Sequence, residues 1–325
     1  MAEAAYVGNH GIRLLTNENI NASPAGGGEA GRVLTPVANK NWGNVNCLCP
    51  DAPSYYNSLQ TKVTWRLGGG SAIGAVYTFS KATNWDDNEE ESIAFGTNGG
   101  FLYWPYQAYR SRNNAVATYD RTHNFSFYGV YELPFGAKKT LAKSGILSAI
   151  AGGWQVNWLL SSLSGYPMTI SGGGSQVNAP GNTQTADQLG PVRILGGIGP
   201  APVTGASTSC PPTDMSCHYF DPTAFAAVPA GQIRFGTSGR NNVRGPGLFN
   251  FDASVSRNFR ISERVNFQIR AEMFGLTNTP HYNNPGIDPT NTATFGVITS
   301  TLNAAGRGTG TGGERQTFVS GRVTF

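Results

Sequence analysis

Four cysteines are the side chains of this sequence whose spacing most directly suggests chemistry. They form two close pairs, Cys47 with Cys49 and Cys210 with Cys217. An even number of cysteines in loop segments favours disulfides in an oxidising compartment. Cys210 and Cys217 can close a small local loop, whereas Cys47 and Cys49 leave a tight local bridge and bridges to partners elsewhere both open. A zinc site made from all four thiolates is the alternative, but neither pair has CxxC spacing.

The histidines do not form a recognisable catalytic or metal-binding motif. His10, His123, His218 and His281 are spread along the chain without HxxxH or HExxH spacing, which argues against a zinc enzyme. The sequence also has no GxSxG elbow, no P-loop and no GxGxxG after a strand. We therefore expect no enzymatic activity and no cofactor.

One segment combines acidic and aromatic side chains. Asp86 and Asp87 precede a run of three glutamates at 89–91, but the EF-hand spacing and its central glycine are missing, so a solvated loop face is favoured over a calcium site. Exposed aromatic rings in such a loop are candidates for contacting a sugar or peptide ligand, and the same rings can instead pack the loop against its neighbours. The aromatic residues that we select as candidate ligand contacts are Phe101, Tyr103, Trp104 and Tyr106.

The composition is unusual for a soluble globular protein. Only 13% of the 325 residues are charged, and 43 are glycine, which is about half and nearly double the respective averages. The aromatic content of 11% argues against intrinsic disorder. The net charge of +4 is spread thinly, so nucleic acid is not an expected partner. No run of 18 apolar residues is present, which excludes a transmembrane helix but not a β-barrel.

Alternating apolar and polar residues predict the elements that position these side chains. Leu59, Val63 and Trp65 share one face of a strand, and Lys62 and Arg66 lie on the other. Charges in the middle of strands require the polar face to be wet. We expect eight strands, at 4–15, 55–67, 72–83, 121–134, 153–170, 249–260, 264–276 and 315–325.

The connections between these strands alternate strictly between long and short. Structureless loops of about 40 residues are uncommon in globular domains. An outer-membrane barrel combines short periplasmic turns with long extracellular loops, and strands of about 12 residues cross its apolar band. Aromatic girdles are expected near both ends, at Trp65, Tyr131 and Trp154 on one side and at Tyr77 and Phe79 on the other. A two-sheet β-sandwich explains the alternation but not the asymmetry of the loops.

Several segments resemble the C-terminal barrel of TonB-dependent receptors, most closely the Oar-like type found in Acidobacteria and myxobacteria. A minor departure is Phe274–Gly275, where that family usually has Phe-Asn shortly after RAE. The similar segments cover nearly the whole chain, and they are YNSLQTKVTWRLGGGSAIGAVYTFSKA at 56–82, DRTHNFSFYGVYELPFG at 120–136, GGWQVNWLLSSLSGYPMTI at 152–170, YFDPTAF at 219–225, FGTSGRNNVRGPG at 235–247, FNFDASVSRNFRISERVNFQIRAEMFGLTNTPHYNNP at 249–285 and the closing RVTF.

The resemblance implies a fragment of a larger receptor. Such receptors have an N-terminal carboxypeptidase-regulatory-like domain, a plug domain and a barrel of about 22 strands. We expect residues 1–325 to form one partial barrel domain without the plug, the TonB box or a signal peptide, because the N-terminus has no basic region followed by an apolar one. On this reading, the chain is part of a receptor that binds and imports a substrate of unknown identity. The alternatives are a complete eight-stranded barrel with a structural or adhesive role and a secreted glycan-binding β-sandwich.

The expected fold is therefore all-β, an antiparallel meander that forms an open part of a transmembrane outer-membrane β-barrel. Expected partners are outer-membrane lipid, the barrel-assembly machinery and a small substrate, with the inner-membrane TonB complex reached only through the missing plug. The last strand places Val319, Val323 and the terminal Phe325 on its outward face. A terminal aromatic residue resembles the assembly signal of bacterial barrels, and the alternative is an ordinary edge strand that ends in phenylalanine. We expect a location in the cell outer membrane of a Gram-negative-type bacterium.

Overall fold

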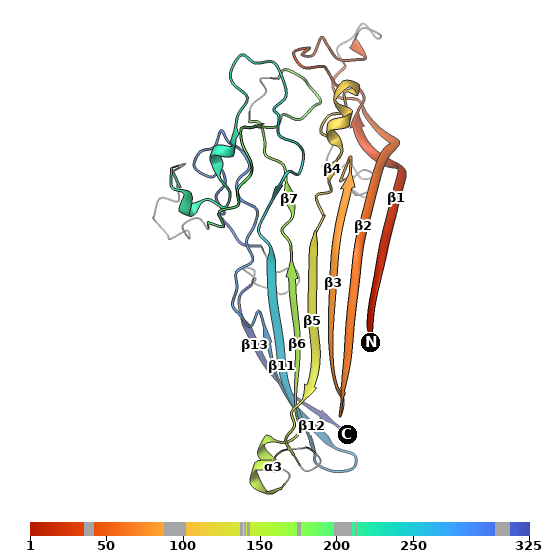
Figure 1. Ribbon diagram of the computed structural model, residues 1–325, viewed down its shortest axis with the longest axis vertical. Coiled ribbons are helices and arrows are strands. Elements are labelled where there is room, and N and C mark those ends of the chain that lie inside the picture. Colours follow the sequence, from red (N-terminus) through yellow and green to blue (C-terminus); the bar gives the residue numbers. More distant parts are fainter. Residues whose placement is uncertain are drawn as a thin grey trace.

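The computed structural model describes residues 1–35, 42–87, 102–136, 139, 141, 144–173, 177–197, 210–211, 213–302 and 313–325. Its main element is one antiparallel sheet whose long strands follow each other in chain order (Figure 1). The predicted meander is thereby confirmed. The eight long strands are β1 (Ala2–Asn19), β2 (Asn46–Gly68), β3 (Ser71–Asn84), β5 (His123–Glu132), β6 (Trp154–Leu163), β11 (Leu248–Arg260), β12 (Asn266–Phe274) and β13 (Gln316–Thr324), and the short β4 (Ala115–Val116) adds to β3.

The first two strands are longer than the alternation predicts. Their ladder continues past irregularities between Gly11 and Leu15 until Asn19 lies opposite Asn46. Cys47 and Cys49 therefore belong to β2, and our placement of this pair in a loop was wrong. Alternation did not reveal the extension because 46–54 is rich in small and polar residues and contains two prolines.

The segment predicted as one strand at 153–170 is instead two strands. β6 ends at Leu163, and β7 (Pro167–Met168) then pairs with β10 (Val243–Arg244) in a separate small sheet. Gly165 lies between them, and a Cβ atom built on it would come within 1.7 Å of the backbone oxygen of Gly245. The chain turns out of the main sheet here because only glycine allows this close backbone approach.

The connections separate by length to the two ends of the sheet, as expected. Residues 20–45, 85–122, 164–247 and 275–315 connect strands at the upper end in Figure 1. The lower end has the turns 69–70 and 261–265 and the segment 133–153, which contains helix α3 (Gly145–Ala151). Gly69 and Gly70 have positive φ angles that suit a tight hairpin between β2 and β3.

The long connections contain most of the apolar core. They include the short strands β8 (Asp187–Gln188) and β9 (Phe225–Ala226) and the 3-10 helices η1 (Gln107–Asn113), η2 (Met215–Cys217) and η3 (Pro222–Ala224). One buried cluster is centred on Phe220, Phe225 and Phe295, and a second on Trp104 and Phe235. We call this packed assembly of the described long connections the cap. Its own core explains how long connections hold a fixed shape without regular secondary structure.

The sheet is open. Its order starts with β1 and ends with β13, and within the described residues neither strand has a partner along its outer edge. The two termini of the chain are therefore on different edges of the sheet.

Candidate functional site

The register of the strands places apolar side chains on one continuous face of the sheet. Leu59 lies opposite Phe79, Ala75 opposite Phe127, and Val156 opposite Val255. These side chains are not covered by the protein: Leu59 is 46%, Val63 51% and Val319 73% exposed. We call this surface the apolar face. A surface of this size that remains exposed in a folded chain marks an interaction with lipid or with another protein.

Aromatic residues border the apolar face at both ends. Near the cap, His10 stacks on Tyr55 with ring centroids 4.2 Å apart, and His123 lies between Tyr77 and Phe79, accepting or donating a 2.8 Å hydrogen bond with the Tyr77 hydroxyl. Near the short turns lie Trp65, Tyr131 and Trp154, with Trp65 opposite Ile73, Tyr131 opposite Val156 and Trp154 opposite Arg257. Rings of this kind suit an interface where one end of the side chain is apolar and the other is wet.

The opposite surface, which we call the polar face, carries small and hydrophilic side chains. Ser58, Ser80 and Ser254 are buried there, and the amide of Asn157 donates to the Ser254 hydroxyl at 3.2 Å. Arg270 pairs with Glu272 at 2.8 Å. Such a face is stable only against water or polar groups, because unpaired polar groups are costly in an apolar medium.

Two arginines attach the cap to the sheet. Arg240 lies between the end of β3 and the connection that follows it. It donates to Asn84 of β3, pairs with Asp87 and donates to Asn113 of η1. Arg244 pairs with the buried carboxylate of Asp120 and donates to the carbonyl of Gly165 at 3.2 Å. The segment GRNNVRGPG thus uses its charged residues for attachment.

Asn241 in the same segment adopts a left-handed backbone conformation with a φ angle of 54°. Its side chain donates to the carbonyl of Val116 at 2.8 Å and accepts from the hydroxyl of Thr169 at 3.1 Å. Asparagine tolerates this conformation better than most residues do. The side chain therefore holds three parts of the cap together from a turn that few other residues would form.

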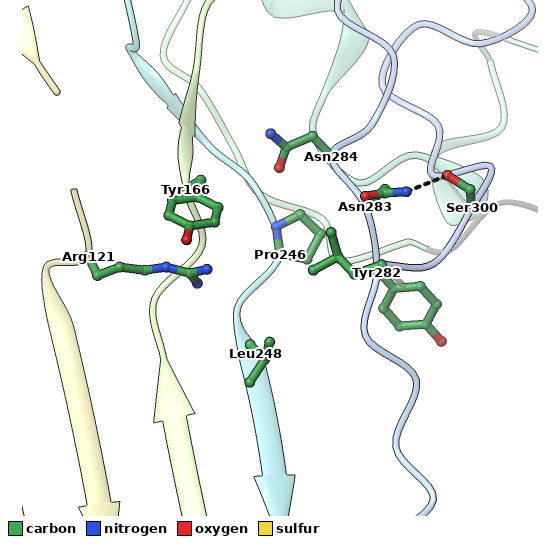
Figure 2. Close-up of a pocket in the computed structure, with 9 residues that line it drawn as sticks. Arg121, Tyr166, Pro246, Leu248, Tyr282, Asn283, Asn284 and Ser300 are labelled. Carbon is green, nitrogen blue, oxygen red and sulfur yellow. Dashed lines mark hydrogen bonds between the residues drawn. The ribbon is translucent and has the colours of Figure 1, made fainter. Parts of the chain in front are cut away.

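A pocket of about 380 Å³ lies where the sheet meets the cap (Figure 2). The guanidinium of Arg121 stacks on the ring of Tyr166, with its carbon 3.5 Å from the ring centroid. On the other side, the amide of Asn283 donates to the Ser300 hydroxyl at 2.8 Å and to the carbonyl of Thr301 at 3.0 Å. We call this cavity the Arg121 pocket, and its further lining residues are Pro246, Leu248, Tyr282, Asn284 and Leu302.

Arg121 also lines a second pocket of about 240 Å³. This one lies on the polar face, next to Gln60, Thr78 and Asn124. The same cation therefore contributes to both hollows, one on the wall of the sheet and one against the cap.

The loop aromatics that we selected do not form an exposed platform. Trp104 is 0% exposed, with the guanidinium of Arg112 over its ring at 4.5 Å, so its assignment as a ligand contact was wrong. It packs in the buried cluster with Phe235 because a large ring is needed to fill the space between two connections. Tyr103 and Tyr106 are half-buried beside it. Phe101 and residues 89–91 lie outside the described residues.

The two acidic residues at the start of that loop serve as attachment points. The hydroxyl of Thr16 donates to Asp86 at 2.7 Å, and Asp87 accepts from the backbone N–H of Thr118 at 2.9 Å while pairing with Arg240. These carboxylates are thus bonded to the protein itself.

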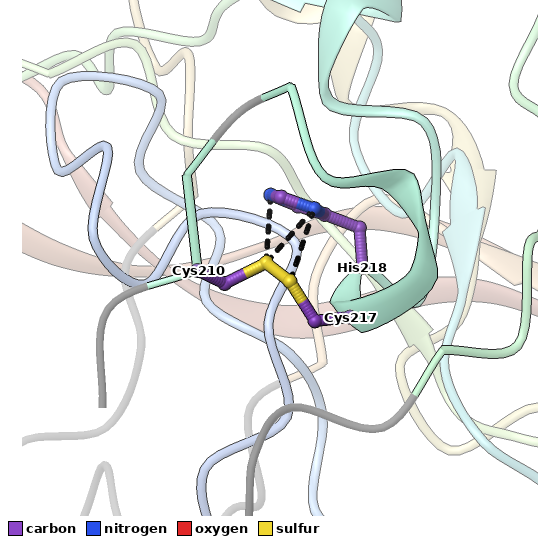
Figure 3. Close-up of side chains that lie close together, drawn as sticks. All are labelled: Cys210, Cys217 and His218. Carbon is purple, nitrogen blue, oxygen red and sulfur yellow. Dashed lines mark hydrogen bonds between the residues drawn. A yellow bond between two sulfur atoms is a disulfide. The ribbon is translucent and has the colours of Figure 1, made fainter. Parts of the chain in front are cut away.

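The four cysteines form two local disulfides, Cys47–Cys49 and Cys210–Cys217. The second pair lies against the ring of His218, as Figure 3 shows, with Nδ1 3.2 Å from the sulfur of Cys210. His218 is buried, and the same Nδ1 is 2.8 Å from the carbonyl oxygen of Asp214. Both sulfur atoms are used by the disulfide. The disulfide and the His218 ring together stabilise a turn of the cap. The two pairs are not brought together into one site.

A further ion pair fixes the cap from within. Arg234 donates to both carboxylate oxygens of Asp187 at 2.6 Å, and the backbone N–H of Thr237 adds a third bond at 3.1 Å. These hydrogen bonds, chiefly those from Arg234, lower the pKa of Asp187 below its usual value although burial opposes them.

The last strand, β13, forms one edge of the sheet and follows the last connection of the cap. Val319 and Val323 are on the apolar face, opposite Ala271 and Phe267. Phe325 follows the end of β13 and is 97% exposed. The predicted site residues thus do not converge. The residues that line the Arg121 pocket were not selected from the sequence, where the only local signal was the charged pair Asp120–Arg121 before a strand.

A family model described as an outer membrane beta barrel domain matches residues 1–316. No curated protein and no solved structure matches the chain. Within the described residues, none of the helices has the length and apolar character to cross a membrane.

Proposed function

The chain belongs to the family of outer membrane beta barrel domains, and we propose that it forms part of the wall of a TonB-dependent receptor that binds a solute outside the cell and imports it. The family places the protein in the outer membrane, with the sheet as its membrane-spanning part. The receptor role goes beyond this, and so does our proposal that the protein binds and transports rather than catalyses.

The observation that carries the proposal is the open sheet with a polar inner surface. The apolar face fits lipid, which leaves the polar face toward the barrel lumen. The outer edges of β1 and β13 carry backbone groups without partners within the described residues. In a bilayer these groups must be paired, because no water is available to bond them. Further strands of a wider barrel would pair both edges.

The segments that resemble TonB-dependent receptors have structural roles consistent with this proposal. GRNNVRGPG attaches the cap to the sheet, and β11 and β12 form adjacent strands of the sheet. A rigid cap and a pocket beside the polar face suit a protein that captures a solute before moving it inward. The partners of this proposal are lipid, the barrel-assembly machinery, the solute and, through a plug domain, the TonB complex.

The second candidate is a complete eight-stranded barrel, favoured by the number of long strands. It requires β1 and β13 to pair with each other. A secreted β-sandwich is not supported, because no second large sheet covers the apolar face within the described residues and the family is one of outer-membrane barrels.

Cysteine cross-linking in outer membranes distinguishes the two barrels. Ala4 and Thr61 lie opposite each other in the ladder of β1 and β2, so the double variant Ala4→Cys/Thr61→Cys should cross-link and serves as the positive control. Ala4→Cys combined with Val319→Cys or Val323→Cys should give no intramolecular cross-link, because other strands separate these edges in a wide barrel. A cross-link between β1 and β13 would establish the small closed barrel instead.

The receptor role is tested separately, by the binding of TonB to the whole gene product purified from outer membranes. It should retain the purified periplasmic domain of TonB in a pull-down, and a scrambled-sequence TonB domain should not be retained. Failure to bind TonB would contradict the receptor role but not the wide barrel.

A further inference from the structure

We propose that the Arg121 pocket binds the carboxylate of an acidic sugar, of the uronic acid class. This inference rests on the proposed function and names the class of solute that the receptor captures.

Within the part of the chain that the structure describes, the charge of Arg121 has no ionic partner. Its neighbour Asp120 is buried and pairs with Arg244, and the backbone N–H of Ala82 also donates to Asp120 at 2.6 Å. Across the described residues, no carboxylate forms an ion pair with Arg121. The pocket therefore has a net positive charge at one wall, which attracts an anionic group.

The guanidinium of Arg121 is held in a fixed orientation. One of its terminal nitrogens donates to the carbonyl of Ser164, and its central carbon lies over the ring of Tyr166. Figure 2 shows the group extended from the end of a strand toward the Tyr166 ring. A planar guanidinium offers two parallel N–H groups that match a carboxylate, and fixing it in advance reduces the entropy lost on binding.

The remaining lining matches sugar hydroxyl groups. Asn283 uses its N–H₂ group for Ser300 and Thr301, so its carbonyl oxygen is left to accept from a ligand hydroxyl. Asn284 adds a second amide. The volume of about 380 Å³ is at the small end of ligand sites, which suits one or two sugar units. A carboxylate close to several hydroxyls is the pattern of a uronic acid.

The first test changes only the ligand. Binding of glucuronic acid, its methyl ester and glucose to the full chain in detergent micelles is measured by calorimetry. Glucuronic acid should bind, whereas the methyl ester and glucose should bind at least about 10-fold more weakly, because a charged hydrogen bond is lost. Equal binding of the acid and its methyl ester would overturn the proposal whatever the fold of any variant.

The second test changes the protein. Arg121→Gln should weaken glucuronic acid binding by about 10- to 100-fold, and Arg121→Lys should have a smaller effect because the charge remains without the planar fork. Arg66→Gln is the matched control, since Arg66 is an exposed arginine near the short turn of β2 and should bind like the unchanged protein. Near-ultraviolet circular dichroism of each variant confirms its fold.

The outcomes are separable from those of the proposed function. Binding of an acidic dipeptide in place of glucuronic acid, or no binding of glucuronic acid at all, would refute the sugar assignment while leaving the cross-linking and TonB results untouched. Conversely, a closed barrel that still binds glucuronic acid through Arg121 would support the binding site and refute the receptor role.

Discussion

Arg240 and Asn84 are 156 residues apart in the sequence, and Nη2 of the arginine donates to both the backbone and the side-chain oxygen of the asparagine at 2.6 Å. Arg240 is only 5% exposed. One buried cation thus joins the longest connection to the end of β3. This contact fixes the position of the cap relative to the sheet.

Replacing this cation should release the cap. Arg240→Met leaves Asp87 without its cationic partner and three acceptors without a donor, at a cost of about 3–5 kcal/mol. We expect proteinase K, whose broad specificity does not depend on arginine, to cleave the cap at much lower concentration while the sheet remains folded, as shown by heat-modifiable migration on gels. Arg193→Met changes an exposed arginine of the same connection and should leave the cleavage pattern unchanged. Unaltered protease resistance of Arg240→Met would refute this anchoring role.

The ion pair of Asp187 with Arg234 should make the cap sensitive to acid. The pKa of Asp187 is lowered in the folded protein, so its stabilising contribution is present above about pH 4, the value of an unfolded aspartate, and is lost as the pH falls through the lowered pKa. Protease resistance of the cap, measured after exposure between pH 6 and pH 2, should decrease in this range. Asp187→Asn should weaken the cap at pH 6 and flatten the pH dependence, while Glu263→Gln in the turn 261–265 should not. An identical acid profile for Asp187→Asn would contradict the prediction.

Gly165 should not tolerate a side chain. A Cβ atom there overlaps the backbone oxygen of Gly245, so Gly165→Ala must separate β7 from β10, at a cost of about 1–3 kcal/mol. The midpoint of urea unfolding, followed by near-ultraviolet circular dichroism of the cap, should decrease. Gly190→Ala is the control, because no atom lies within 4 Å of a Cβ atom built at Gly190. Equal midpoints for the two variants would show that the backbones do not meet as described.

All four cysteines should be oxidised in the protein isolated from membranes. Both pairs are joined within the chain, so thiol titration after denaturation without reductant should find almost no free thiol, and titration after reduction should find four. Cys210→Ser should free one thiol, at Cys217, if the pairing is local. Four thiols before reduction would contradict the disulfides and the oxidising compartment together.

The terminal aromatic should affect assembly more than stability. Phe325 is exposed, so its deletion removes little packing. The deletion should lower the amount of protein in the outer membrane, while the protein that does assemble should unfold at the same urea concentration. Thr324→Ala, on the other side of the same strand end, is the control. An unchanged yield after deletion of Phe325 would remove the assembly role.

The strands could be predicted from the sequence because their pattern is local. Leu59, Val63 and Trp65 alternate with polar residues, and any extended chain with this pattern has one apolar face. The register of the sheet then brought these residues beside Phe79, Ala75 and Ile73 without changing the face they were assigned to. The separation of long and short connections to opposite ends followed from the antiparallel order alone.

The cap and its pocket were decided only by the tertiary structure. Trp104 lies in a connection without periodicity, and Arg121 lies at the start of a segment expected as a strand and just before β5 in the structure. Nothing local indicates that the first is buried in a cluster with Phe235 and that the second lines a cavity. Their surroundings come from other connections, such as Phe235 beside Trp104 and Asn283 in the pocket of Arg121, and these meet only because the sheet fixes the ends of every connection. A local pattern specifies which face a strand presents, but contacts between irregular segments depend on how the whole chain closes around them.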